Sequence, residues 1–148
     1  MSKILVQFDL VKPKFPKGAL EMEGFYENVD RINGIAENSP GFIWREANED
    51  EEELERLWGK GYLYTLSVWN NVASLKSFLY HSPHVDILKK GHEWFHKIAH
   101  PRMVLWWAES GQIPTLLEAH ERLVCLCEKG PSYHAFDLKN AYEPLVIY

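Results

Sequence analysis

The sequence predicts an α+β domain in which helices pack against a four-stranded antiparallel sheet. Within residues 1–110, strand-like and helix-like periodicities follow one another in the order β-α-β-β-α-β. The last of these strands, Met103–Ala108, is apolar on both faces, so it needs a cover on each side. One more helix follows, because Thr115-Leu-Leu-Glu118 is a capping box and Gly130-Pro131 is a helix stop.

The first strand is expected over Ile4–Leu10. Its apolar residues alternate with Leu5, Gln7 and Asp9, which places a charge in the middle of one face. A turn-rich connector then leads to a helix expected from about residue 19 to 38, where apolar residues recur at three- and four-residue steps.

A second strand is expected over residues 41–47, after a proline and a glycine that end the helix. The run Asn48–Glu55 that follows it is acidic and nearly free of apolar residues. We expect a solvated loop there. A calcium loop is the less favoured alternative, because the run lacks spaced Asp or Asn ligands and a glycine in its middle.

The third strand, Tyr62–Trp69, is rich in β-branched and aromatic residues. A helical stripe runs from Val72 to Leu79, and Pro83 interrupts it because proline has no N–H and clashes with the preceding turn. We expect Ser82 to cap a second helix. The inward stripe of this second helix is expected to contain Val85, Leu88, His92, Phe95 and Ala99.

Length and composition indicate one domain over residues 1–148, with a core at 1–110 and a C-terminal helix and tail at 111–148. Within the tail, short extended segments are expected at 133–138 and 145–148. The two cysteines, Cys125 and Cys127, are expected to be reduced and structural.

The net charge of −5 and the lack of a basic stripe disfavour nucleic acid and anionic membranes as partners. The chain shows no signal peptide and no apolar run of membrane-spanning length, so we expect a cytoplasmic protein. It also has no glycine-rich phosphate loop, G-x-S-x-G elbow or C-x-x-C pair. Nucleotide binding, serine hydrolysis and disulfide exchange are therefore not predicted.

The element order is that of the ferredoxin-like, split βαβ arrangement, followed by an extra C-terminal helix. In this arrangement the helices lie on one face of the sheet only. Because Met103–Ala108 is apolar on both faces, we expect the open face to pack on a second copy of the chain. The result would be a homodimer that forms a two-sheet α+β barrel.

Short motifs spread over nearly the whole chain carry a family resemblance. They are Ser67-Val-Trp69, Ser82-Pro-His84, Glu93-Trp-Phe95, Val104-Leu-Trp-Trp107, Gly111-Gln-Ile-Pro-Thr115, Glu118-Ala119, Arg122-Leu123, Gly130-Pro131 and Ala135-Phe136. Together they resemble a bacterial domain-of-unknown-function family of the dimeric α+β barrel superfamily, beside the antibiotic-biosynthesis monooxygenases and the spheroidene-monooxygenase-like proteins. The resemblance implies the fold more than an activity, because that superfamily contains haem enzymes, cofactor-free oxygenases, isomerases and binding proteins.

The aromatic share of 14% favours a pocket for a small, flat apolar or aromatic ligand between the sheet and the helices. The alternative is that these side chains only fill the core and an interface. Charges in mid-strand, such as Arg45 and Asp9, usually pair or meet a ligand, and Gln7 and Asn70 are possible polar contacts. The expected ligand-binding residues are Trp44, Arg45, Tyr64, Trp69, Phe78, Trp106 and Trp107.

In an enzyme, Asp9, His84 or His92 would move protons in that pocket during a monooxygenase-like oxidation. A protein that binds a small molecule or haem without catalysis is the alternative. The resemblance makes haem conceivable, because haem-binding barrel relatives have an axial histidine on this same helical region, where His84 or His92 would serve.

The segment His92-Glu-Trp-Phe-His96 matches the H-E-x-x-H pattern of zinc-dependent hydrolases. In that pattern two histidines one helical turn apart bind zinc and the glutamate activates water. No third ligand with characteristic spacing accompanies the pair, so zinc ranks below haem.

Overall fold

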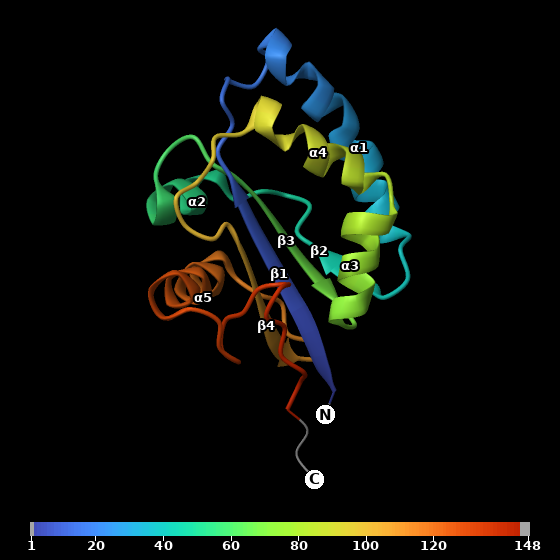
Figure 1. Ribbon diagram of the computed structural model, residues 1–148. Coiled ribbons are helices and arrows are strands. Elements are labelled where there is room, and N and C mark those ends of the chain that lie inside the picture. The colour runs from blue at the N-terminus through green and yellow to red at the C-terminus, as the bar shows by residue number, and fades with distance from the viewer. Residues whose placement is uncertain (1, 146–148) are drawn as a thin grey trace.

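The computed structural model describes residues 2–145, which form an α+β domain around one antiparallel sheet (Figure 1). The strands are β1 (Lys3–Val11), β2 (Phe42–Arg45), β3 (Leu63–Trp69) and β4 (Met103–Glu109), in the order β2-β3-β1-β4. The strand β1 is therefore flanked on both sides, and its alternation sets the two faces of the sheet. The α+β class and the four antiparallel strands predicted from the sequence are confirmed.

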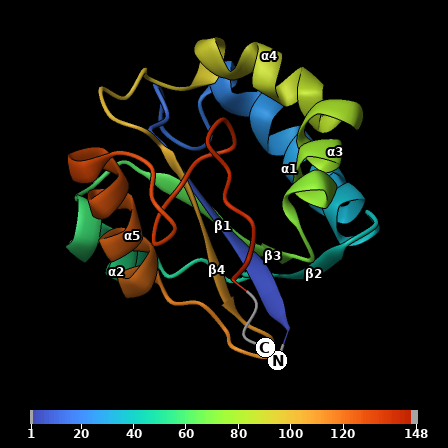
Figure 2. The same cartoon turned by 60° about the horizontal axis from the view of Figure 1, so that its bottom comes forward.

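Helices cover both faces of this sheet, as Figure 2 shows. One face is covered by α1 (Glu23–Glu37, after the 3-10 turn Leu20–Met22), α3 (Val72–His81) and α4 (His84–Trp94). The opposite face is covered by α2 (Glu51–Trp58) and α5 (Leu116–Lys129). We call these the α1/α3 face and the α2/α5 face. From β1, Leu5 belongs to the α1/α3 core, whereas Ile4, Val6, Phe8 and Leu10 belong to the α2/α5 core.

The expectation that helices lie on one face only was wrong. The face that was expected to meet a second copy is buried by the chain itself, because Leu54 of α2 and Leu116, Ala119 and Leu123 of α5 pack against it. The strand β4 is indeed covered on both sides, with Trp106 entirely buried. Its second cover is intramolecular, so among residues 2–145 both faces of the sheet are already packed against helices. The homodimer that the sequence predicted stays a prediction.

The acidic run after β2 is also not a loop, because most of it forms the start of α2. Asp50 caps this helix by accepting a hydrogen bond of 3.1 Å from the backbone N–H of Glu53. The acidic residues of the first turn then lie where the helix dipole favours negative charge. Leu54 anchors the helix with 4% of its surface exposed, and Trp58 stacks on Phe8 with ring centroids 5.0 Å apart.

The break between α3 and α4 lies where proline predicts it. The hydroxyl of Ser82 accepts a hydrogen bond of 3.1 Å from the His84 N–H at the start of the second helix, but the N-cap residue is Pro83 and not the predicted Ser82. The predicted inward stripe of α4 was wrong, however, because the helix ends at Trp94 and His92 is exposed. Trp94 is the buried residue at this end, packed within 3.3 Å of the position that a Cβ on Gly24 would occupy.

The last helix begins and ends as predicted. Thr115 accepts a hydrogen bond from the Glu118 N–H at 3.1 Å, and Gly130 ends the helix with a φ of 76°, a conformation that favours glycine. The chain then returns along β4, where Phe136 and Leu105 exchange two backbone hydrogen bonds. The second extended segment predicted in the tail lies almost wholly outside the described residues. Within residues 2–145, no helix is long and apolar enough to cross a membrane.

Candidate functional site

Polar side chains cross the α1/α3 face of the sheet in a strip. Residues directly opposite one another on neighbouring strands share a face, and the register pairs Asp9 with Thr65, Gln7 with Ser67, and Ser67 with Arg45. We call these five residues the polar strip. Gln7 is buried, with 4% of its surface exposed, whereas Thr65 is exposed. The covering helices therefore leave one part of the strip open to water.

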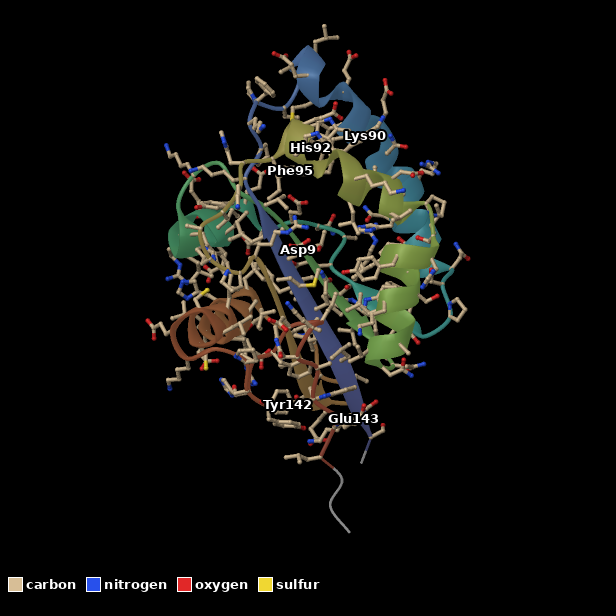
Figure 3. The ribbon with its side chains drawn as sticks, in the orientation of Figure 1. Asp9, Lys90, His92, Phe95, Tyr142 and Glu143 are labelled. Atoms are coloured by element: carbon tan, nitrogen blue, oxygen red, sulfur yellow. The ribbon has the colours of Figure 1, made fainter. Side chains whose placement is uncertain are left out.

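Asp9 is the one acid of the strip, and Figure 3 shows it on β1. Its side chain is 18% exposed, and its Oδ1 atom is buried without a hydrogen-bond partner among the described residues. Burial raises the pKa of Asp9 to about 6, although the charge of Arg102 and the backbone N–H of Leu10 oppose the rise. A carboxyl group with this pKa is suited to proton transfer near neutral pH.

Arg102 lies just before β4 and is the positive charge nearest to that carboxylate. Its Nε atom is 3.7 Å from Asp9 Oδ1, and 42% of its side chain is exposed. An ion pair at this distance and exposure contributes little to stability. The same guanidinium also lies close enough to His84 to lower the pKa of that imidazole, so Asp9, Arg102 and His84 belong to one neighbourhood.

Of the two histidines considered for the pocket, His84 is the inward one. Its ring packs against Phe78 with centroids 4.9 Å apart, and its Nδ1 atom lies 3.3 Å from the Leu79 carbonyl oxygen. A carbonyl only accepts, so Nδ1 donates and Nε2 is left as the acceptor of a neutral imidazole. Burial is the main cause of the lowered pKa of His84, which favours this neutral form.

His92 and His96 do not form the arrangement that the zinc pattern requires. The helix α4 ends at Trp94, so His96 lies beyond the helix. The backbone N–H of His96 donates to the Lys12 carbonyl at 2.8 Å. His92 is exposed at the end of α4, higher in the view of Figure 3 than Asp9. Among residues 2–145, no group of three or more His, Cys, Asp or Glu side chains is placed to hold a metal ion.

The sheet separates the predicted aromatic ligand contacts into two groups. Trp44, Tyr64 and Trp106 pack in the α2/α5 core, whereas Trp69, Phe78 and Trp107 pack in the α1/α3 core. The two groups therefore do not line one cavity. Most of these side chains already pack against, or hydrogen-bond to, neighbouring residues.

Each of these engagements is a specific contact. The Tyr64 hydroxyl donates to Glu46. The Trp69 and Phe78 rings stack at 5.3 Å, and the Trp107 N–H donates to the Tyr142 carbonyl at 2.8 Å. Arg45 pairs with Glu37 of α1, with Nε and Oε1 2.8 Å apart.

Two surface grooves lie away from the polar strip. One, of about 610 Å³, is formed by the loop after β4 and the start of α5, including Ile113 and Arg122. The other, of about 440 Å³, lies beside α3 and includes Ser77, His81 and Phe78. Neither groove is lined by Asp9 or His84.

Sequence patterns missed two residues of the site, Arg102 and Thr65. Arg102 lies outside the strand periodicity, and Thr65 is an ordinary residue in a strand. Both become significant only through the strand register, which places Thr65 opposite Asp9 and joins the Arg102 carbonyl to the Leu10 N–H at 2.8 Å. The mid-strand aspartate was the available signal, because a charge in a strand usually pairs with an opposite charge, which here comes from the segment just before a neighbouring strand.

Comparison with known proteins gives a family but no activity. A family model described as "Domain of unknown function (DUF3291)" matches residues 4–146. No curated protein matches the chain. Among solved structures, the chain is similar to the crystal structure of PA3566 from Pseudomonas aeruginosa, with 10% sequence identity and a TM-score of 0.48. The match covers 77% of this chain and 98% of that one.

Proposed function

Because the chain belongs to the DUF3291 family, whose description names no activity, we propose a function from the polar strip: Asp9 is a general base that acts on a small hydroxyl-bearing aromatic or enolic molecule. The observation that carries the proposal is the buried Oδ1 of Asp9, which has no hydrogen-bond partner among the described residues. A buried acceptor without a partner costs about 1–3 kcal/mol. Such a cost is typical of sites that a ligand completes.

The neighbouring residues suit this chemistry. The carboxylate of Asp9 takes the proton from the substrate hydroxyl, and the Arg102 guanidinium, 3.7 Å from that carboxylate, stabilises the substrate anion that forms. The phenolate or enolate is the electron-rich form that reacts with dioxygen, so a monooxygenase-like oxidation is the full reaction that we propose. In it one oxygen atom forms a bond to a substrate carbon, and the other leaves as water with two hydrogens of the substrate. The substrate itself supplies the electrons, so that a quinol becomes a hydroxyquinone. Because the chain covers both faces of its own sheet, the proposed active unit is a single chain.

Oxygen consumption with a panel of quinols and polyphenols tests this proposal. We expect the rate to rise with pH through about 6, where Asp9 ionises, and to fall at least tenfold in Asp9→Asn. Asp30→Asn, an exposed carboxylate on α1, is the matched control and should leave the rate unchanged. Saturable binding without oxygen consumption would favour a binding protein instead, and the absence of both would reject the proposal.

Haem binding is a second hypothesis, and it depends on His84. The neutral imidazole and its free Nε2 acceptor favour it. The packing of His84 against Phe78 at 4.9 Å disfavours it, because haem would have to displace the Phe78 ring. We therefore rank it below proton transfer by Asp9. A Soret shift on adding haemin that is lost in His84→Ala would reverse this ranking.

A further inference from the structure

The donor and acceptor roles in the polar strip follow from one residue, Trp69. Its indole N–H can only donate, and it donates to Ser67 Oγ at 2.9 Å. The Ser67 hydroxyl hydrogen is thus left to donate to Gln7 Oε1, 2.7 Å away. The amide orientation of a glutamine is usually ambiguous, and here Gln7 Oε1 is the atom that faces Ser67. Its Nε2 group therefore faces Thr65 and donates to Thr65 Oγ1 at 3.4 Å.

This series of hydrogen bonds determines which role the Thr65 hydroxyl has left, that of a donor. Because Thr65 Oγ1 accepts from Gln7, its own hydroxyl hydrogen is directed to another acceptor. Thr65 is exposed and lies directly opposite Asp9 on the same face of the sheet. Side chains opposite one another in an antiparallel sheet have Cβ atoms about 4.5–5.5 Å apart. A single ligand oxygen between them could accept from Thr65 and donate to Asp9.

We propose that Thr65 recognises the substrate hydroxyl and that Trp69, Ser67 and Gln7 orient Thr65 for this role. The inference deepens the proposed function and rests on it. In the proton transfer, the substrate O–H bond breaks and its proton forms a new O–H bond on the Asp9 carboxylate. The electron pair stays on the substrate oxygen, which continues to accept the Thr65 hydrogen bond. The substrate class is accordingly phenols and enols with a free hydroxyl, and their methyl ethers are excluded.

Binding of 4-nitrophenol tests the role of Thr65, because its absorbance reports whether it is bound as phenol or phenolate. Thr65→Val keeps the side-chain shape and removes the hydroxyl, whereas Thr65→Ser keeps the hydroxyl. Loss of one hydrogen bond to the charged phenolate oxygen should weaken binding by about ten- to a hundredfold in Thr65→Val, and Thr65→Ser should bind within about twofold of the original protein. The methyl ether, 4-nitroanisole, should bind weakly and equally to all three proteins.

Asp9→Asn separates this inference from the proposed function. We expect the original protein and Thr65→Ser to bind nitrophenol as phenolate, and Asp9→Asn to bind it only as the neutral phenol. If Thr65→Val binds as tightly as the original protein while Asp9→Asn loses the phenolate signal, the role of Thr65 is rejected and the general base stands. If Asp9→Asn keeps the phenolate signal, or if the original protein does not bind the probe, the role of Thr65 and the role of Asp9 as general base are both rejected.

Discussion

Trp69 and Ser67 are joined by a hydrogen bond of 2.9 Å between side chains two residues apart on β3. Such neighbours point to the same face of a strand, so the bond closes locally beside the buried Gln7. Ser67→Ala would leave both the Trp69 N–H and Gln7 Oε1 without this partner. Each buried group left unpaired costs about 1–3 kcal/mol, so we expect a loss of about 2–6 kcal/mol in the free energy of unfolding.

Urea denaturation measures this loss. Ser77→Ala is the matched control, because Ser77 is an exposed serine on α3 and a surface substitution changes stability by about 0.5 kcal/mol or less. Equal midpoints for the two variants would contradict the hydrogen-bond chain from Trp69 to Gln7.

Asp9 should make the protein less stable as the pH rises. Its folded-state pKa of about 6 lies above its ordinary value of 3.8, so the folded state holds the proton more tightly than the unfolded chain does. The resulting stability is fully present below pH 3.8 and is lost as the pH rises through about 6. The loss corresponds to about 3 kcal/mol. It arises from burial and is only partly offset by Arg102.

Asp9→Asn should remove this dependence. We expect the variant to be more stable than the original protein at pH 8, by up to about 3 kcal/mol, with a much smaller difference at pH 4. Unfolding in urea at the two pH values checks this. A variant that is less stable at pH 8 would show that the Asp9 carboxylate serves the fold, and the case for a functional site would weaken.

The sequence predicted the faces of the strands better than the site between them. Alternation alone placed Gln7 and Asp9 on one face of β1, because the side-chain period of a strand is two residues. It could not place Thr65 opposite Asp9, since that depends on the register of β1 against β3. Asp9 was found because a charge in mid-strand is unusual, whereas the partners of such a charge come from parts of the chain that only the fold brings together.

The helix α2 shows where composition misled the prediction. The acidic run Asn48–Glu55 was interpreted as a solvated loop. Acidic residues in the first turn also stabilise the start of a helix, however, and Asp50 is the N-cap residue of α2. The apolar residues that anchor the helix are Leu54, Leu57 and Trp58. They lie in its second half, and of the three only Leu54 falls within the run that was expected to be a loop. Their spacing of three and four residues was the signal that could have identified the helix.

Leu54 should therefore be one of the positions that hold α2 on the sheet. It is 4% exposed, and replacing a buried leucine by alanine costs about 2–5 kcal/mol. Leu117, which is 59% exposed on α5, is the control, and Leu117→Ala should have little effect. We expect Leu54→Ala to lower the free energy of unfolding by at least about 2 kcal/mol, and equal unfolding midpoints for the two alanine variants would place α2 away from the core.

The covered sheet also predicts the oligomeric state. A barrel dimer requires an apolar sheet face that a second copy can bury, but here Val6 and Trp106 on the α2/α5 face are completely buried within one chain. Exposing that face would require α5 to leave its core, and several leucines that are now buried would become exposed to water. Each of them would lose about 2 kcal/mol of stabilisation. Light scattering at micromolar concentration should therefore give a mass near 17.3 kDa. A mass twice as large would show that two chains associate. If amide hydrogens of α2 and α5 also exchanged rapidly in that dimer, the sheet would pair with its copy after all, and the intramolecular cover would be rejected.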